Sequence, residues 1–299
     1  MVLSSDRTRC RAVFFPDETS IPTRNRAPHP ASEARHPACS RSFWRRGTDS
    51  AADARKRTYV RGMTADSPAS PPAPIPYFDD LAELYERFTL VRDAATSPIR
   101  SWLLEQLPPG KRALDAGCGS GNNCVMLTEH YDDVVGVDIA QRMLDLAAAK
   151  SGRVPVRYEC RSALDLSPAT DGRFDLVMSV NAVFHMGAAD VVLSRLRELV
   201  APGGRLVIVD VTRPDDEEAG VPDTYAFDTA RIVYEVSGDA DAAADSLRMM
   251  LHPRWLEMSS ALLPLTEEQF AREYRAALPG ARIIPNLIPT LSAAVWDAA

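Results

Sequence analysis

The hydrophobic pattern predicts no regular element in the first part of the chain. Residues 1–62 show neither the three- and four-residue apolar spacing of a helix nor the alternation of a strand. Prolines interrupt any element that begins there, among them Pro22, Pro28, Pro30 and Pro37. Residues 67–76 are rich in proline and predict a stiff linker. We therefore expect a disordered leader and linker at 1–76 and a folded domain at 77–299.

The folded part begins with two predicted helices. Apolar side chains recur there at intervals of three and four residues, as expected for an amphipathic helix: Leu81, Leu84, Tyr85 and Phe88. A second helix is predicted over about 98–106, ahead of Pro108-Pro109-Gly110. Two short apolar runs then predict buried strands, Ala113-Leu114 and Val134–Asp138.

Charge divides the chain at the same place. The formal net charge of the 299 residues is −7. Residues 1–62 hold 13 Lys and Arg against 6 Asp and Glu, a net +7, and the remainder holds 21 against 35, a net −14. The acidic domain argues against nucleic acid as a partner, because nucleic-acid binding requires a basic surface. For the leader three interpretations stay open: an extension without a role ahead of a start at Met63, a transit peptide, and a tether.

Apolar runs and cysteine usage indicate where in the cell the protein is located. No apolar run approaches the ~18 residues of a membrane-spanning helix, so we expect no membrane partner. Five cysteines at scattered positions do not make a disulfide framework, which favours a reducing, cytoplasmic location. The histidines and cysteines share no ligand spacing, so we expect no metal.

A glycine-rich turn after the first strand is the strongest candidate for a binding site. Residues 112–121 read Arg-Ala-Leu-Asp-Ala-Gly-Cys-Gly-Ser-Gly, and a helix is predicted from Asn122 to about His130. Glycine adopts positive φ and lets the backbone approach a ligand, and the start of the helix offers free N–H groups. Strand, turn and helix together are typical of nucleotide-type sites in doubly wound α/β proteins.

The spacing within this turn separates two kinds of cofactor. Dinucleotide sites use G-x-G-x-x-G, in which a helix end faces a pyrophosphate. The pattern here is Asp115-x-Gly117-x-Gly119-x-Gly121. A carboxylate in the turn repels a pyrophosphate but attracts an ammonium group, so the turn favours an amino-bearing ligand.

A second acid ends the next predicted strand. Asp138 follows Gly121 by 17 residues and closes the run Val134–Asp138. A carboxylate at such a strand end can accept hydrogen bonds from both hydroxyls of a ribose. The alternative for Asp138 is a cap on the helix that follows.

The two motifs together resemble the class I S-adenosylmethionine-dependent methyltransferases, and most of all their small-molecule group. The resemblance is carried by Leu-Asp-Ala-Gly-Cys-Gly-Ser-Gly and by Val-Gly-Val-Asp-Ile-Ala-x-x-Met-Leu, and it covers about Tyr77 to Val211. It implies an α/β fold with a Rossmann-like, seven-stranded, mostly parallel sheet, helices on both faces and a small helical cap. The later elements it implies are strands at 156–159, 174–180 and 205–211, a turn at 202–204, and a closing hairpin of 281–285 with 290–296.

The resemblance also implies a cap insertion at about 214–262, with helices over 223–236 and 239–251. Its larger side chains would either wall an apolar substrate pocket or pack the cap onto the sheet: Tyr225, Phe227, Met249, Met250 and Trp255. The last helix would begin after a capping box, Thr266-x-x-Gln269.

At the methionine end of S-adenosylmethionine, the resemblance implies backbone contacts from the three glycines of the turn. Asp115 would bond toward the amino group, directly or through water. Asn181 would lie under the methionine part, and Tyr85 of the leading helix would belong to a lid over the cofactor.

At the adenosine end, the resemblance implies that Asp138 holds the ribose. Ile139 and Met143 would flank the adenine. Ser162 and Ala163 stand where the family has an acid followed by a small or apolar residue, in contact with the adenine amino group. Ser162 departs from that pattern.

Two residues are candidates for acting on the methyl acceptor. His185 follows the fourth strand and is either a general base or a structural histidine. Asp210, at the end of the fifth strand, would orient the substrate or the base, or would be a plain polar residue at a strand end. His252, in the cap, is a weaker candidate base.

The combined expectation is an enzyme that moves a methyl group to O, N or C of a small organic molecule, in the cytoplasm and in secondary metabolism. An NAD(P)-dependent oxidoreductase and an inactive cofactor-binding relative stay open as alternatives. Either a monomer or a homodimer is compatible with the sequence.

Overall fold

The computed structural model describes residues 75–92, 97–152, 154–213, 225–288 and 290–299. All of them belong to one unit of the chain, Ser70–Ala299. The predicted leader up to residue 74 and the first part of the predicted cap, residues 214–224, lie outside the described residues.

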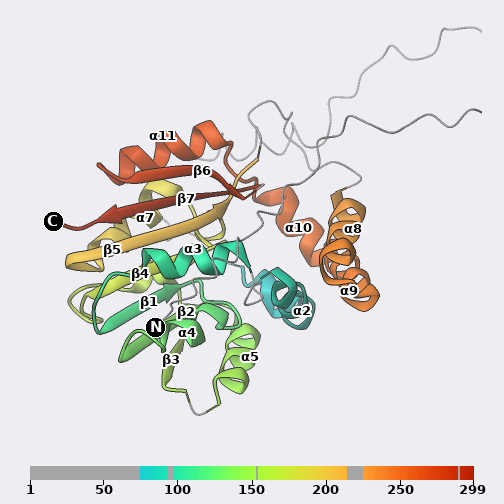
Figure 1. Cartoon of the computed structure of the whole chain (residues 1–299), viewed down its shortest axis with the longest axis horizontal. Helices are drawn as coiled ribbons and strands as arrows, with labels where there is room; N and C mark the ends of the chain where they lie inside the picture. The colour runs from blue at the N-terminus through green and yellow to red at the C-terminus, as the bar shows by residue number, and fades with distance from the viewer. Residues whose placement is uncertain (1–74, 93–96, 153, 214–224, 289) are drawn as a thin grey trace, which may run out of the picture. The chain divides into compact units, whose positions relative to one another are not determined.

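Within the described residues, seven strands form one sheet with the order β3-β2-β1-β4-β5-β7-β6 (Figure 1). The strands are β1 Arg112–Ala116, β2 Asp133–Asp138, β3 Val156–Cys160, β4 Phe174–Val180, β5 Val200–Val211, β6 Arg282–Ile288 and β7 Leu291–Asp297. The first five strands are parallel, and β7 runs antiparallel to both β5 and β6. The predicted mostly parallel, seven-stranded sheet is confirmed.

Helices surround this sheet and extend beyond it. They are η1 Tyr77–Asp79, α2 Ala82–Arg92, α3 Pro98–Gln106, α4 Asn122–Leu127, α5 Gln141–Ser151, η2 Ala163–Asp165, α6 Val183–Met186, α7 Ala189–Glu198, α8 Tyr225–Ser237, α9 Ala240–Met250, α10 Pro253–Ala261 and α11 Glu267–Ala277. The bounds of α3 and β4 are those predicted from the sequence.

Two apolar clusters hold the helices on the sheet. On one face, sheet residues such as Leu114 and Val177 pack with Leu196 of α7 and Phe270 of α11. On the other face, residues of α3, α4 and α5 pack with sheet residues such as Val134. Strands that are buried on both faces read as continuous apolar runs, which is why β1, β2 and β4 could be recognised from the sequence.

Several boundaries differ from the sequence prediction, among them those of β5, β6 and α4. The turn predicted at 202–204 lies inside β5, because the strand pairs with β4 both before it and after it, through Val200 and Arg205. The pairing register shifts between Phe174 and Leu176, so these residues form a bulge in which Gly203 has φ +74°. Helix α4 ends at Leu127 instead of His130, where the Thr128 hydroxyl donates to the Val125 carbonyl.

The cap helices pack against the leading helix. Met249 and Met250 of α9 are buried in a cluster with Leu81, and Trp255 of α10 packs at its edge. Phe227 of α8 is 60% exposed. These cap residues therefore do not form one pocket wall, and the two methionines pack against the leading segment and not onto the sheet. The side chain of Tyr225 lies outside the description.

Replacement of Thr266 by alanine should lower the free energy of unfolding by about 1 kcal/mol, the usual effect of losing a helix cap. The Thr266 hydroxyl accepts from the Gln269 N–H at 3.2 Å, and the Gln269 side chain accepts from the Thr266 N–H at 2.8 Å, so the predicted capping box is present. Urea unfolding measures the effect, and Thr266→Ser is the matched control because it keeps the hydroxyl. Equal stability of the alanine and serine variants would contradict the prediction.

Candidate active site

The glycine turn is held at the carboxyl edge of the sheet. The N–H groups of Gly117 and Cys118 donate to the Val137 carbonyl at 2.8 and 3.0 Å, which fixes the turn against the end of β2. Gly117 has φ +75°, and a Cβ atom at this position would overlap the side chain of Ala182. The first glycine of the turn is therefore required both for its backbone conformation and for the close approach of the segment after β4.

Asp138 ties the turn to the beginning of α5. One carboxylate oxygen accepts from the Gly119 N–H at 2.9 Å, and the other accepts from the Ala140 N–H at 2.9 Å. Burial raises the pKa of Asp138, and these backbone donors oppose that rise. Since each carboxylate oxygen can accept more than one hydrogen bond, Asp138 keeps capacity for further donors.

The segment after β4 brings two incompletely bonded polar side chains to the same edge. Asn181 has φ +55°, and its N–H donates to the Val209 carbonyl at 2.7 Å. Its side-chain oxygen is buried and has no hydrogen-bond partner among the described residues, and the same holds for Nδ1 of His185. A buried polar atom without a partner costs free energy, so these two atoms are candidates for contact with a bound ligand.

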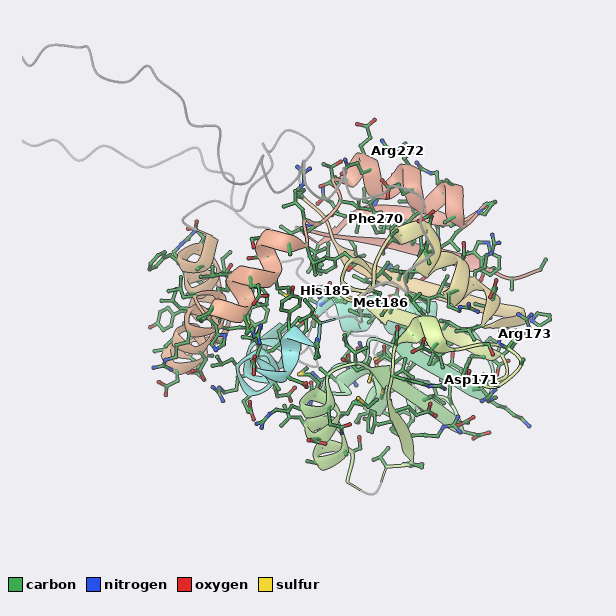
Figure 2. The ribbon with its side chains drawn as sticks, turned by 180° about the vertical axis from the view of Figure 1, so that it is seen from behind. Asp171, Arg173, His185, Met186, Phe270 and Arg272 are labelled. Atoms are coloured by element: carbon green, nitrogen blue, oxygen red, sulfur yellow. The ribbon has the colours of Figure 1, made fainter. Side chains whose placement is uncertain are left out.

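His185 lies in an aromatic environment at the end of α6. Its ring centroid is 5.4 Å from that of Phe78 and 3.8 Å from that of Phe184. Burial lowers the pKa of His185 to about 4, so its imidazole is neutral at physiological pH. Met186 is the next residue (Figure 2). Its methyl carbon would be 2.8 Å from a Cβ atom at Gly117, so α6 reaches the glycine turn.

The leading segment lies over α5 and the turn. The Arg142 N–H of α5 donates to Asp79 at 3.0 Å. Lys150 of α5 pairs with Glu86 of α2 and also contacts Ser120 of the turn, at 3.4 Å from its hydroxyl. Tyr85 packs in a cluster with Met143.

Sequence reasoning missed three residues around this site: Phe78, Lys150 and Met186. Each one makes its contact across a long stretch of chain, so no local spacing could identify it. The nearest signal was the apolar pair Tyr77-Phe78 at the start of the folded part.

Some predicted site residues lie away from the opening of the turn. Asp115 has no exposed surface, and its carboxylate accepts from the Cys124 thiol at 3.4 Å. The Ser162 hydroxyl accepts from the Leu164 N–H at 3.2 Å and so begins η2, and Ala163 is buried in the core. Ile139 is half-buried beside Asp138.

Asp210 does not contact His185 directly. Its carboxylate accepts from the Phe184 N–H at 3.1 Å, from the Val211 N–H at 3.2 Å and from the Tyr274 hydroxyl at 3.3 Å. Burial raises the pKa of Asp210 to about 7 against the effect of these donors. Asp210 therefore acts on α6 through the backbone of the residue before His185.

Other candidates have structural roles. His252 begins α10, and its Nδ1 atom accepts from the Arg254 N–H at 3.2 Å. Among the described residues, no group of three or more His, Cys, Asp or Glu is arranged to hold a metal ion. In the same part of the chain no helix is long and apolar enough to cross a membrane.

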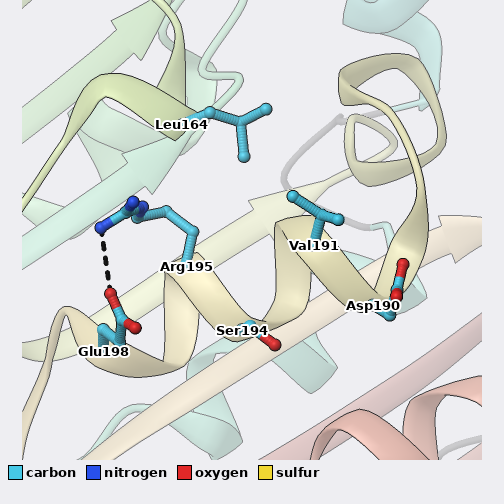
Figure 3. A pocket seen from close by; sticks show the side chains of 6 residues that line it. All are labelled: Leu164, Asp190, Val191, Ser194, Arg195 and Glu198. Carbon is cyan, nitrogen blue, oxygen red and sulfur yellow. Dashed lines mark hydrogen bonds and ion pairs between the residues drawn. The ribbon is translucent and has the colours of Figure 1, made fainter. Parts of the chain in front are cut away.

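A shallow groove on the exposed side of α7 lies apart from these residues (Figure 3). Its volume is about 390 Å³, and its lining is Leu164, Asp190, Val191, Ser194, Arg195 and Glu198. Arg195 pairs with Glu198, three residues later on α7, at 3.0 Å. None of the predicted site residues lines this groove.

Comparison with known proteins agrees with the fold and the turn. Residues 114–208 match the family described as methyltransferase domain. The chain is 36% identical over 117 residues to 2-methyl-6-phytyl-1,4-hydroquinone methyltransferase of Synechocystis, which is 38% of this chain and 36% of that protein. It is 33% identical over 132 residues to ubiquinone biosynthesis O-methyltransferase of Bradyrhizobium, 42% of this chain and 51% of that protein. The matches thus span about a third to a half of these relatives.

Solved structures share the fold at low identity. The structure of DhpI in complex with SAH aligns at a TM-score of 0.50 with 16% identity, over 73% of this chain and 92% of that chain. The plantazolicin methyltransferase BamL, also with SAH, aligns at 0.50 with 13% identity, over 75% and 93%.

The doubly wound sheet with a glycine turn at its carboxyl edge defines a Rossmann-like cofactor-binding protein. Residues 114–208 match the methyltransferase-domain family, in agreement with the resemblance of this segment to the class I S-adenosylmethionine-dependent methyltransferases.

Proposed function

We propose that this protein is an S-adenosylmethionine-dependent methyltransferase whose acceptor is O, N or C of a small organic molecule. The observation that carries the proposal is a pair of buried polar atoms that have no partner among the described residues, Asn181 Oδ1 and His185 Nδ1, next to a glycine turn braced by Asp138. The small-molecule methyltransferases among the relatives support the choice of acceptor.

The residues at the edge of the sheet fit this cofactor. Asp138 would accept from the ribose hydroxyls, and Asn181 would use its side-chain oxygen toward the methionine part. Ile139 and Met143 would flank the adenine, with Tyr85 of the lid above. When bound, the sulfonium cofactor supplies the reactive methyl group. The chain's own contribution is alignment of the acceptor and exclusion of water by the lid.

Two residues would act on the acceptor side. His185, neutral because burial lowers its pKa, would accept a proton from an acceptor that holds one at neutral pH. Asp210 would be a positioning residue, since it holds the backbone of Phe184 and thereby the start of α6. Asp115, buried beneath the turn, would act on the amino group through water or through the turn itself.

Isothermal calorimetry with S-adenosylmethionine, S-adenosylhomocysteine and NAD tests the proposal on the full chain. We expect binding of the first two ligands and none of NAD, because the turn lacks the G-x-G-x-x-G spacing that faces a helix end toward a pyrophosphate. Binding of NAD alone would favour the oxidoreductase alternative. A screen of small acceptors with methyl-labelled cofactor follows, and cofactor binding without any methyl transfer would favour an inactive relative.

We also propose that residues 77–299 carry the activity, because every site residue lies there, and that residues 1–76 are a leader. A cytoplasmic location without nucleic-acid or membrane partners is proposed from cysteine usage, charge and the apolar runs. Secondary metabolism is proposed from the resemblance to small-molecule methyltransferases, and either a monomer or a homodimer is compatible with it.

A further inference from the structure

A second cavity lies beside α6 and shares no residue with the proposed cofactor site. Its volume is about 230 Å³. It is lined from the segment around α6, from the end of β5 and from α11 with the residues before it: Val183, Phe184, Gly187, Ala188, Ala189, Asp190, Asp210, Val211, Leu263, Leu265, Phe270, Glu273 and Tyr274. Val183 and Phe184 of α6 line this cavity. The other two residues of α6 face away from it: His185 contacts Phe78 of the leading segment, and Met186 contacts the glycine turn.

The lining of the cavity combines apolar walls with acidic groups. Phe184 and Phe270 supply aromatic surface, and Leu263 and Leu265 supply aliphatic surface. Figure 2 shows Phe270 on α11 above the end of α6 that carries His185. A compound with an apolar body would therefore find matching walls. The volume is below the ~300–1,000 Å³ of drug-sized sites, so the body must be small.

All ionisable groups of the lining other than Tyr274 are carboxylic acids, namely Asp190, Asp210 and Glu273. Glu273 lies 3.6 Å from Arg272, but the Arg272 side chain is 62% exposed and does not line the cavity. An ion pair so exposed to water is strongly screened. The lining thus carries negative charge that its own residues do not neutralise, which attracts a cation and repels an anion.

Asp210 is the best placed of the three acids. It is 2% exposed, at the end of a strand, where ligands of doubly wound sheets bind. The Tyr274 hydroxyl donates to it at 3.3 Å, so the phenol oxygen can still accept from a ligand. The raised pKa of Asp210, about 7, shows that burial without a counter-charge disfavours its ionised form.

We propose that this cavity binds a small apolar amine as its ammonium ion, with Asp210 as the counter-charge and the rings of Phe184 and Phe270 around the apolar body. Aromatic faces attract cations as well, so the walls and the charge act together. No residue of the proposed cofactor site lines this cavity, whereas Asp210 and Phe184 also belong to the acceptor side of the proposed function.

Calorimetry of the full chain with 2-phenylethylammonium chloride tests the proposal, with neutral 2-phenylethanol as the isosteric control. We expect one bound amine per chain and an affinity at least ~10-fold above that of the alcohol, as charge-assisted hydrogen bonding predicts. The affinity should rise about 10-fold from pH 6 to pH 8, because Asp210 ionises through its pKa of about 7 while the amine stays protonated.

Two variants locate the binding. Asp210→Asn keeps the shape of the side chain and should abolish both the preference for the amine and its pH dependence. Ala188→Phe narrows the cavity from its exposed side without changing any acid, and should weaken amine binding at least ~10-fold while binding of S-adenosylmethionine stays unchanged. If Asp210→Asn fails to fold, Ala188→Phe still tests whether the amine binds in this cavity. Three results would overturn the proposal. They are equal affinity for the amine and the alcohol, no binding of the amine at 10 mM (about 3 kcal/mol of affinity), and unchanged amine affinity in Ala188→Phe.

Discussion

Turnover should fall at least ~100-fold when His185 is replaced by alanine, with affinity for S-adenosylmethionine kept within about a factor of three. His185 has a buried Nδ1 atom without a partner among the described residues, and it sits on the helix that touches the glycine turn. Its pKa of about 4 leaves the lone pair free to take a proton at neutral pH. Single-turnover transfer of a labelled methyl group measures the chemical step apart from binding.

The pH dependence of this step has a definite sign. Because protonation removes the base form only near pH 4, the rate should stay level from pH 8 to pH 6 and fall below about pH 5. His252→Ala is the matched control, since His252 caps α10 and has no contact with the turn among its described bonds. A near-wild-type rate in His185→Ala would assign His185 a packing role among Phe78 and Phe184.

Affinity for the cofactor should fall at least ~10-fold in Asp138→Ala, as expected from the loss of charge-assisted hydrogen bonds. The same change removes the acceptor for the Gly119 and Ala140 N–H groups, so the turn also loses its brace. Calorimetry gives the affinity, and thermal melting of the free protein shows how far the turn has loosened.

The control for this variant lies on the same strand. Asp133 begins β2 at the opposite edge of the sheet and pairs with Arg112 at 2.8 Å, with a side chain that is 42% exposed. Asp133→Ala should therefore leave cofactor affinity unchanged. If Asp138→Ala bound the cofactor as tightly as the wild type, the ribose assignment would have to be given up.

The sequence predicted those parts of the fold that depend on neighbouring residues. Pro98 and the apolar spacing after it define α3, and the continuous apolar run of β4 marks a strand buried on both faces. The Pro202-Gly203-Gly204 segment was misread because these residues usually end an element. Here the partner strand β4 continues the pairing on both sides, and glycine accommodates the bulge.

The sequence could predict site residues that lie within one strand or turn, but not contacts between elements that are far apart in the chain. The spacing along the sequence identifies Asp138 and the glycines. Phe78 and Lys150 reach the site from helices far away in the chain, so no spacing identifies them. The burial of Asp115 could have been inferred, because side chains two apart in a strand share a face and Ala113 belongs to the core.

The leading helix α2 is attached both to the cap helix α9 and to α5 beside the sheet. Arg87 joins it to Asp245 of α9, while Lys150 joins it to α5, and Leu81 is wholly buried against Met249 and Met250. The ion pairs contribute little to this attachment because they are in contact with water. The buried apolar contact contributes more, because separating α2 from α9 would expose apolar surface to water. We therefore expect that a displacement of α2 to admit the proposed cofactor would also displace the cap helix α9.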